Sequence, residues 1–138
     1  MTDISVTTVG NYQAEDRRWL RSQWGQGPGE NPSIVLDISA FTAGTHYPDG
    51  YIKSGEPLGV ITAASGNGKT VVGPYNGTAE DGRETCVGFL HSSVKVPASG
   101  ADPGGALVAA GFIDESKLPR AIDSAGKADL KLCHFSAF

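Results

Sequence analysis

The sequence predicts a mainly β protein, a small β-barrel or β-sandwich that carries an extended N-terminal arm. The chain has 138 residues, which is enough to bury one hydrophobic core. Its 19 glycines are about twice the usual share of roughly 7%, which indicates many turns and short strands. Short β-forming runs alternate with turn residues, and such strands bury their apolar sides by packing face to face or by closing on themselves.

The arm and its linker occupy residues 1–30, and the β-rich domain occupies residues 31–138. The arm is set apart by aromatic, apolar and basic residues at Arg17, Arg18, Trp19, Leu20, Arg21 and Trp24. Because Leu20 and Trp24 are spaced four apart, a short helix would place them on one face. About two turns of helix are not stable alone in water, so this segment needs a surface to pack against. The glycine- and proline-rich residues 25–30 read as a flexible tether.

Two interpretations of the arm follow. In the first, Trp19, Leu20 and Trp24 fold back onto the core of their own chain, because tryptophan is usually largely buried. In the second, the arm docks on another subunit, with tryptophan and arginine as the anchors that protein interfaces favour. The glycine-rich tether favours docking, so we expect the arm to supply the partner-binding residues.

The strands of the domain are expected where β-forming residues run together, at residues 34–38, 58–63, 70–72, 84–96, 106–113 and 130–135. Between the second and third of these lies Ser65-Gly66-Asn67-Gly68, which predicts the tight turn of a hairpin. A further turn precedes Pro57, because Gly55 tolerates a left-handed backbone. Helix is expected only as one turn at residues 120–125, ended by Gly126.

The hairpin turn overlaps a false match to a phosphate-binding loop at Gly66-Asn67-Gly68-Lys69-Thr70. A true P-loop has a glycine where Ala63 stands, and a helix begins at its Lys-Thr pair. Here Val-Val-Gly-Pro follows at residues 71–74, and this run does not open a helix. We therefore favour a hairpin turn over a nucleotide-binding enzyme.

The composition also limits the classes of partner that we expect this chain to bind. The formal net charge is −4 and the basic residues are dispersed outside the arm, so no nucleic acid partner is expected. No apolar run approaches the ~20 residues that cross a bilayer, and the N-terminus does not resemble a signal peptide. We expect a soluble intracellular product with no membrane partner.

No group of side chains points to catalysis, a metal or another cofactor. Cys86 and Cys133 predict two separate buried thiols, since their spacing fits neither a metal site nor a secreted disulfide framework. The histidines, at positions 46, 91 and 134, have no ligand-like spacing and read as surface or strand-end residues. Four carboxylates in turn-like stretches are expected to be solvated: Asp81, Glu84, Asp114 and Glu115.

Four features in this order resemble the bacteriophage head decoration proteins of the lambda capsid-stabilising type. They are Ile-Lys-Ser-Gly-Glu-Pro-Leu-Gly at residues 52–59, Cys-Val-Gly-Phe-Leu at 86–90, the strand at 106–113 and Ser-Lys-Leu-Pro at 116–119. The resemblance spans residues 31–138 and adds the general idea of a tethered arm. It implies a β-tulip-like domain that trimerises on the outer face of an icosahedral head, at local threefold positions. The arm of this chain departs from the family in being rich in tryptophan and arginine.

The resemblance further implies a structural protein of the virion, made in the host cytoplasm, that stabilises contacts between subunits of the major capsid protein and is not an enzyme. The capsid-binding residues are then expected to be Arg17, Arg18, Trp19, Leu20, Arg21 and Trp24. The alternative is a tail or surface module that binds carbohydrate through three exposed rings, those of Tyr47, Tyr51 and Tyr75.

Overall fold

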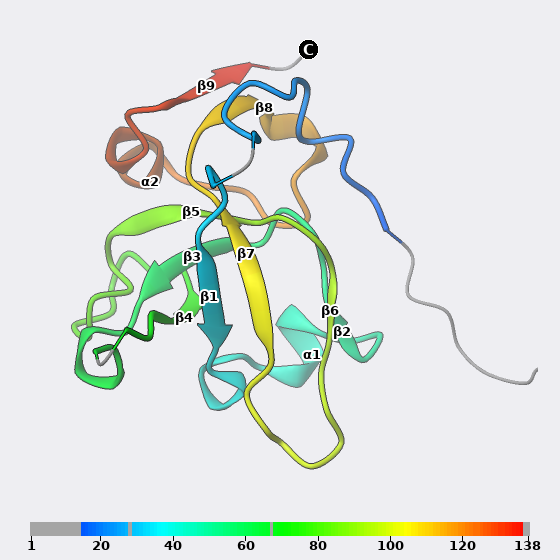
Figure 1. Ribbon diagram of the computed structural model, residues 1–138, viewed down its shortest axis with the longest axis vertical. Coiled ribbons are helices and arrows are strands. Elements are labelled where there is room, and N and C mark those ends of the chain that lie inside the picture. The colour runs from blue at the N-terminus through cyan, green and yellow to red at the C-terminus, as the bar shows by residue number, and fades with distance from the viewer. Residues whose placement is uncertain (1–14, 28, 67, 137–138) are drawn as a thin grey trace, which may run out of the picture.

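Five strands close into a barrel in the computed structural model, which describes residues 15–27, 29–66 and 68–136 (Figure 1). Around the barrel the order is β1 (Ser33–Leu36), β4 (Val71–Pro74), β3 (Pro57–Val60), β5 (Cys86–Leu90) and β7 (Gly104–Val108). Strands β1 and β4 run parallel, and the other neighbouring pairs are antiparallel. The predicted mainly β fold and its barrel are confirmed.

Strands β3 and β4 form the predicted hairpin. Leu58 pairs with Pro74 and Val60 with Val72, and the turn is closed by a bridge between Gly66 and Lys69. A short 3-10 helix, η2 (Thr62–Ala64), leads into that turn, and Asn67 lies outside the described residues. The residues after Lys69 enter a strand and not a helix, so the structure offers no phosphate-binding loop here.

Two small ribbons flank the barrel. Strand β2 (Tyr51–Ile52) pairs with β6 (Val94–Lys95), and β8 (Gly111–Asp114) pairs in parallel with β9 (Cys133–Ser136). The second ribbon and the helix α2 (Ser124–Asp129) form a layer above one end of the barrel in Figure 1. Short helices connect the strands. They are the 3-10 helices η1 (Ile38–Ala40) and η3 (Glu115–Lys117) and the α-helix α1 (Ala43–His46).

Several sequence-based boundaries are corrected. The strand expected at residues 84–96 is two strands, β5 and β6. The strand expected at residues 106–113 is two strands, because the chain leaves the barrel at Ala109 and enters the upper layer as β8. The expected helix ended by Gly126 instead runs through this glycine, and the side chain of Asp123 caps it by accepting a hydrogen bond from Gly126 N at 2.7 Å. A Cβ at Gly126 would lie 2.8 Å from Ile122 Cγ1, so close packing explains the glycine.

The core has two parts. The barrel interior holds Ile34, Leu36, Ile38, Phe41, Ile52, Leu58, Val72, Leu90 and Leu107. The space between the barrel and the upper layer holds Trp19, Tyr75, Cys86, Phe89, Val108, Ile113, Ile122 and Leu130. Neighbours on one strand serve different parts, because successive side chains of a strand point to opposite faces. The second core therefore attaches the upper layer to the barrel wall.

Candidate protein-binding surface

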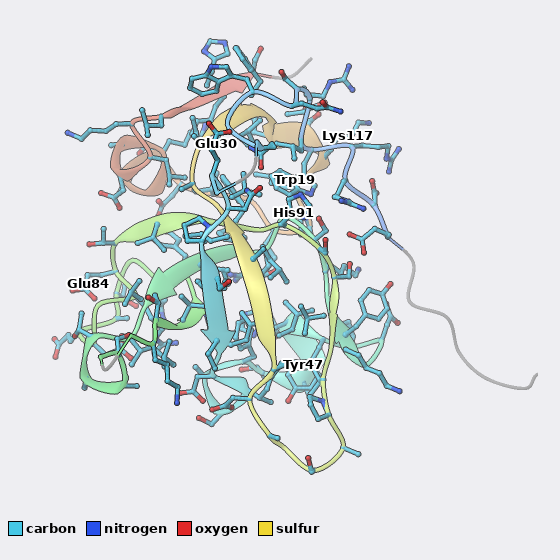
Figure 2. The ribbon with its side chains drawn as sticks, in the orientation of Figure 1. Trp19, Glu30, Tyr47, Glu84, His91 and Lys117 are labelled. Carbon is cyan, nitrogen blue, oxygen red and sulfur yellow. The ribbon has the colours of Figure 1, made fainter. Side chains whose placement is uncertain are left out.

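Trp19 belongs to the second core. Its side chain is 0% exposed, its ring lies 5.5 Å from that of Phe89, and its Nε1 donates a hydrogen bond to Ser54 Oγ at 3.0 Å. Figure 2 shows Trp19 between the barrel and the upper layer. The expectation of Trp19 as an exposed anchor is therefore wrong, since a side chain with no exposed surface cannot contact another subunit. For this residue the alternative reading, folding back onto its own core, is correct.

The neighbours of Trp19 form a short strand-like contact and not the helix suggested by their spacing. Leu20 makes an antiparallel bridge to Ile113, Arg21 N donates to Phe112 O at 2.9 Å, and Trp19 O accepts from Asp114 N at 2.7 Å. Leu20 is half-buried against the second core. Residues 19–21 thus extend the edge of β8.

The described part of the linker is also held against the barrel. Gln26 Nε2 donates to Ala110 O at 2.6 Å, and Asn31 Nδ2 donates to Gln26 Oε1 at 2.8 Å and Leu107 O at 3.2 Å. A Cβ at Gly25 would lie 2.8 Å from Ala110 O. Glycine is therefore needed at residue 25 for close approach, and residues 25–27 are packed instead of forming a free tether. Residues 1–14 and Pro28 lie outside the described residues.

Trp24 is the predicted anchor that remains at the surface. It is 55% exposed and packs edge-on against Phe112, with 5.8 Å between ring centroids. Phe112 lies 5.8 Å from the ring of His134, its register partner on β9. With the 63% exposed Leu132, these residues make what we call the aromatic surface: Trp24, Phe112, Leu132 and His134. Sequence reasoning missed Phe112 and Leu132, because their exposure depends on the pairing of β8 with β9.

A groove of 560 Å³ runs beside the aromatic surface. Trp24 and Leu132 line it together with Ala109 and Ala110, so most of its lining side chains are apolar or small. Glu30 lines it as well and supplies an acidic group. Exposed large apolar residues around a groove are typical of sites that bind another protein.

The three arginines of the arm are exposed, and two of them pair with neighbouring carboxylates. Arg17 lies 3.4 Å from Glu15, and Arg18 lies 2.9 Å from Asp16. The Arg18 guanidinium holds the pKa of Asp16 at about 2, well below its usual value. The carboxylate of Glu15 also accepts from Ser93 N at 3.1 Å, which fixes the start of the described chain on the barrel. These pairs are surface ion pairs, and each contributes little to folding.

Two carboxylates of the described residues are buried, although the sequence predicted neither of them in the core. Glu56 is 2% exposed, and its Oε1 lies 2.5 Å from Arg120 Nε. Burial raises the pKa of Glu56 to about 7 in spite of this neighbour. Asp114, expected to be solvated, is fully buried; its Oδ1 accepts from Ser116 N and Oγ, and these bonds lower its pKa.

Both thiols are free: Cys86 is buried, as expected, and Cys133 is half-buried. Burial raises the pKa of Cys86 to about 12 and that of Cys133 to about 11, so both stay protonated at neutral pH. Such thiols are poor nucleophiles. Among residues 15–27, 29–66 and 68–136, no three histidines, cysteines or carboxylates are grouped as metal ligands. No helix in that part of the chain is long and apolar enough to cross a membrane.

The three tyrosines of the carbohydrate alternative do not share a groove. Tyr75 is buried and donates its hydroxyl proton to Asp123 Oδ1 at 2.8 Å, while Tyr51 lines a separate pocket of 280 Å³. Tyr47 is half-buried next to α1, at the end of the barrel opposite Trp19 (Figure 2). The arrangement does not favour stacking of sugar rings on these three side chains.

Among the predicted site residues, the structure thus leaves Arg17, Arg18, Arg21 and Trp24 exposed, half-buries Leu20 and buries Trp19. Comparison of the chain with protein-family models, curated proteins and solved structures gave no match.

Proposed function

We propose that this chain is a capsid decoration protein that binds the outer surface of an icosahedral phage head and stabilises contacts between major capsid protein subunits. The resemblance of residues 31–138 to such proteins supports this function. The single observation that carries it is the aromatic surface, where Trp24, Phe112 and Leu132 are the exposed large apolar side chains of the described residues.

The chemistry of the aromatic surface suits a protein partner. Covering Trp24, Phe112 and Leu132 would remove apolar area from water, worth roughly 25 cal/mol for each Å² buried. Tryptophan contributes more than most residues to binding when water is excluded around it. Arg21, whose backbone bonds to Phe112, would add a rim contact to carboxylates of the shell.

The proposed assembly is a homotrimer on the capsid exterior. Three copies around a local threefold position would engage three neighbouring capsid subunits at once, and linked contacts bind more tightly than one contact alone. This assembly follows the resemblance.

Purification of assembled heads from the cells that make this protein tests the function. We expect the chain to copurify with the heads in a fixed ratio to the major capsid protein, and to appear at threefold positions in a reconstruction. Heads that never carry the chain, or carry it only in substoichiometric amounts that salt removes, would overturn the proposal.

A further inference from the structure

A pocket of 460 Å³ lies at a different place from the aromatic surface, beside α1 and the end of β4. Polar side chains that line it include Thr45, His46, Asn76, Arg83 and Arg120. Among the described residues, no aspartate or glutamate lines this pocket. The hydrogen bonds that these side chains already make determine which of their donors could bind a ligand.

The backbone and side chain of Arg83 pack closely against two glycines. Gly59 and Gly73 face each other across β3 and β4. A Cβ at Gly59 would lie 2.6 Å from Arg83 Cα, and one at Gly73 would lie 2.8 Å from Arg83 Cδ. Only glycine leaves room for the arginine to lie on the barrel wall at these two positions. The guanidinium is then fixed by Asp81, whose Oδ2 accepts from Arg83 Nε at 2.9 Å.

Arg120 is fixed in a comparable way, because its Nε bonds to the buried Glu56. In both arginines the internal ion pair uses Nε. An arginine has five N–H donors, so four remain on the terminal nitrogens of each guanidinium. In the described part of the chain, those nitrogens make no hydrogen bond, and the side chains of Arg83 and Arg120 are 20% and 30% exposed.

His46 and Asn76, which also line the pocket, each keep a donor that is not used by their own hydrogen bonds. His46 Nδ1 accepts from Thr42 N at 2.8 Å, so the proton of the neutral ring is on Nε2. Asn76 Oδ1 accepts from Thr78 N at 3.0 Å and from Thr78 Oγ1 at 2.8 Å, so its NH₂ group is left to donate. The acceptors of both side chains are thus used, and within the described residues their donors make no hydrogen bond.

From this arrangement we propose that the pocket binds an oxyanion, a carboxylate or phosphate group, held by Arg83, Arg120, His46 and Asn76. Two guanidinium groups match the geometry of such anions, and charge-assisted hydrogen bonds are about twice as strong as neutral ones. Partial burial of both arginines strengthens the attraction, because water screens it less. This site is independent of the proposed capsid function, which uses another face of the protein.

The pKa of His46 should report whether an anion occupies the pocket. Burial lowers the pKa of His46, and the positive charges of Arg120 and Arg83 lower it further. The carboxylates of Glu56 and Asp81 are paired with these arginines. An anion bound against both guanidinium groups would stabilise the protonated imidazole and raise the pKa of His46. A charge bound elsewhere on the surface would not do so.

The test is an NMR titration of the full chain with sodium phosphate and, separately, sodium acetate, at constant ionic strength set with chloride. We expect saturable shifts of the His46 ring signals and a rise in the pKa of His46. Phosphate binding at least tenfold tighter than acetate assigns a phosphate ligand; equal or tighter acetate binding assigns a carboxylate. If neither anion perturbs His46 beyond the effect of chloride, the proposal is wrong.

Asn76→Asp is the sharpest variant. The new carboxylate keeps an acceptor for Thr78 but replaces the NH₂ donor with a negative oxygen, so we expect at least tenfold weaker anion binding. Ser99→Asp is the matched control, because it adds the same charge on an exposed loop and keeps an acceptor for Ala101 N. Equal affinity in Asn76→Asp and the wild type, or equal loss in Ser99→Asp, contradicts the site.

Arg83→Gln serves as an independent variant should Asn76→Asp not fold. It removes one cation without adding a negative charge, and it should also weaken phosphate or acetate binding at least tenfold. Unchanged anion affinity in a folded Arg83→Gln protein would equally overturn the proposal.

Discussion

Trp19 Nε1 donates to Ser54 Oγ across 35 positions of sequence, and this bond joins the N-terminal segment to the turn before β3. Ser54 Oγ in turn donates to His91 O at 2.7 Å, and Ser54 N donates to Ser93 Oγ at 3.0 Å. The N-terminal segment, the turn and the end of β5 are therefore held as one unit. What looks in sequence like a detachable arm is, from Glu15 onward, part of the fold.

Trp19→Ala should accordingly destabilise the protein, whereas Trp24→Ala should not. Removing a buried tryptophan leaves a cavity and typically costs about 3–5 kcal/mol of unfolding free energy. Trp24 is more than half exposed, so we expect a cost of about 1 kcal/mol or less. Urea unfolding of both variants measures the difference. Equal midpoints would show that the second core does not depend on Trp19.

Gly55→Ala should destabilise more than Gly50→Ala. Both glycines have a positive φ, +91° at Gly55 and +85° at Gly50, so each alanine pays a backbone cost of roughly 1–2 kcal/mol. A Cβ at Gly55 would also lie 2.8 Å from Trp19 Nε1, whereas nothing lies within 4 Å of one at Gly50. The two variants should differ in unfolding free energy by about 1 kcal/mol or more, and this difference measures the cost of the clash between the new Cβ and Trp19. A Gly50→Ala variant as unstable as Gly55→Ala would refute this reading.

The contribution of Glu56 to stability should fall as pH rises from about 4.5 to about 7, while the lowered pKa values of His46 and His91 act in the opposite direction. The folded state raises the pKa of Glu56 from 4.5 to about 7, so between these values the folded protein holds a proton that the unfolded chain has lost. The stabilisation is complete below the unfolded pKa and is lost as pH rises through the folded one. Summed over the interval, the loss is on the order of 3 kcal/mol.

Thermal unfolding of the wild type and Glu56→Gln from pH 4 to pH 8 measures this dependence. Glutamine has no proton to lose, so the wild type should lose stability relative to the variant as pH rises through this interval. Parallel curves for the two proteins would mean that other groups cause the pH dependence.

Much of the fold could be predicted from local sequence. The hairpin between β3 and β4 follows from the turn residues around Gly66, and the turn at Gly55 follows from its need for a positive φ. The break between β7 and β8 could not be predicted, because the apolar run continues through Ala109 and Ala110 and only tertiary packing shows where the chain changes layers.

The candidate site was harder to predict, because burial is decided by partners far away in sequence. Trp19 contacts Ser54 and Phe89, and no local sequence pattern around position 19 predicts either contact. Phe112 reads as an ordinary strand residue until its pairing with β9 places it beside Trp24 at the surface. A tryptophan near arginines in a polar segment does not separate the two cases, because Trp19 fits that pattern and is buried whereas Trp24 is exposed.

Head binding by surface variants tests the central claim, that the aromatic surface attaches this protein to a phage capsid. Heads assembled without the protein would be mixed with the wild type, with Trp24→Ser/Leu132→Ser, or with the control Gln23→Ser, and bound protein would be measured after sedimentation. Gln23 is exposed and neighbours Trp24 in the same groove, but it is not apolar. We predict stoichiometric binding of the wild type and control, and at least a hundredfold loss of affinity in the double variant. A folded double variant that saturates heads at the wild-type concentration would contradict the claim.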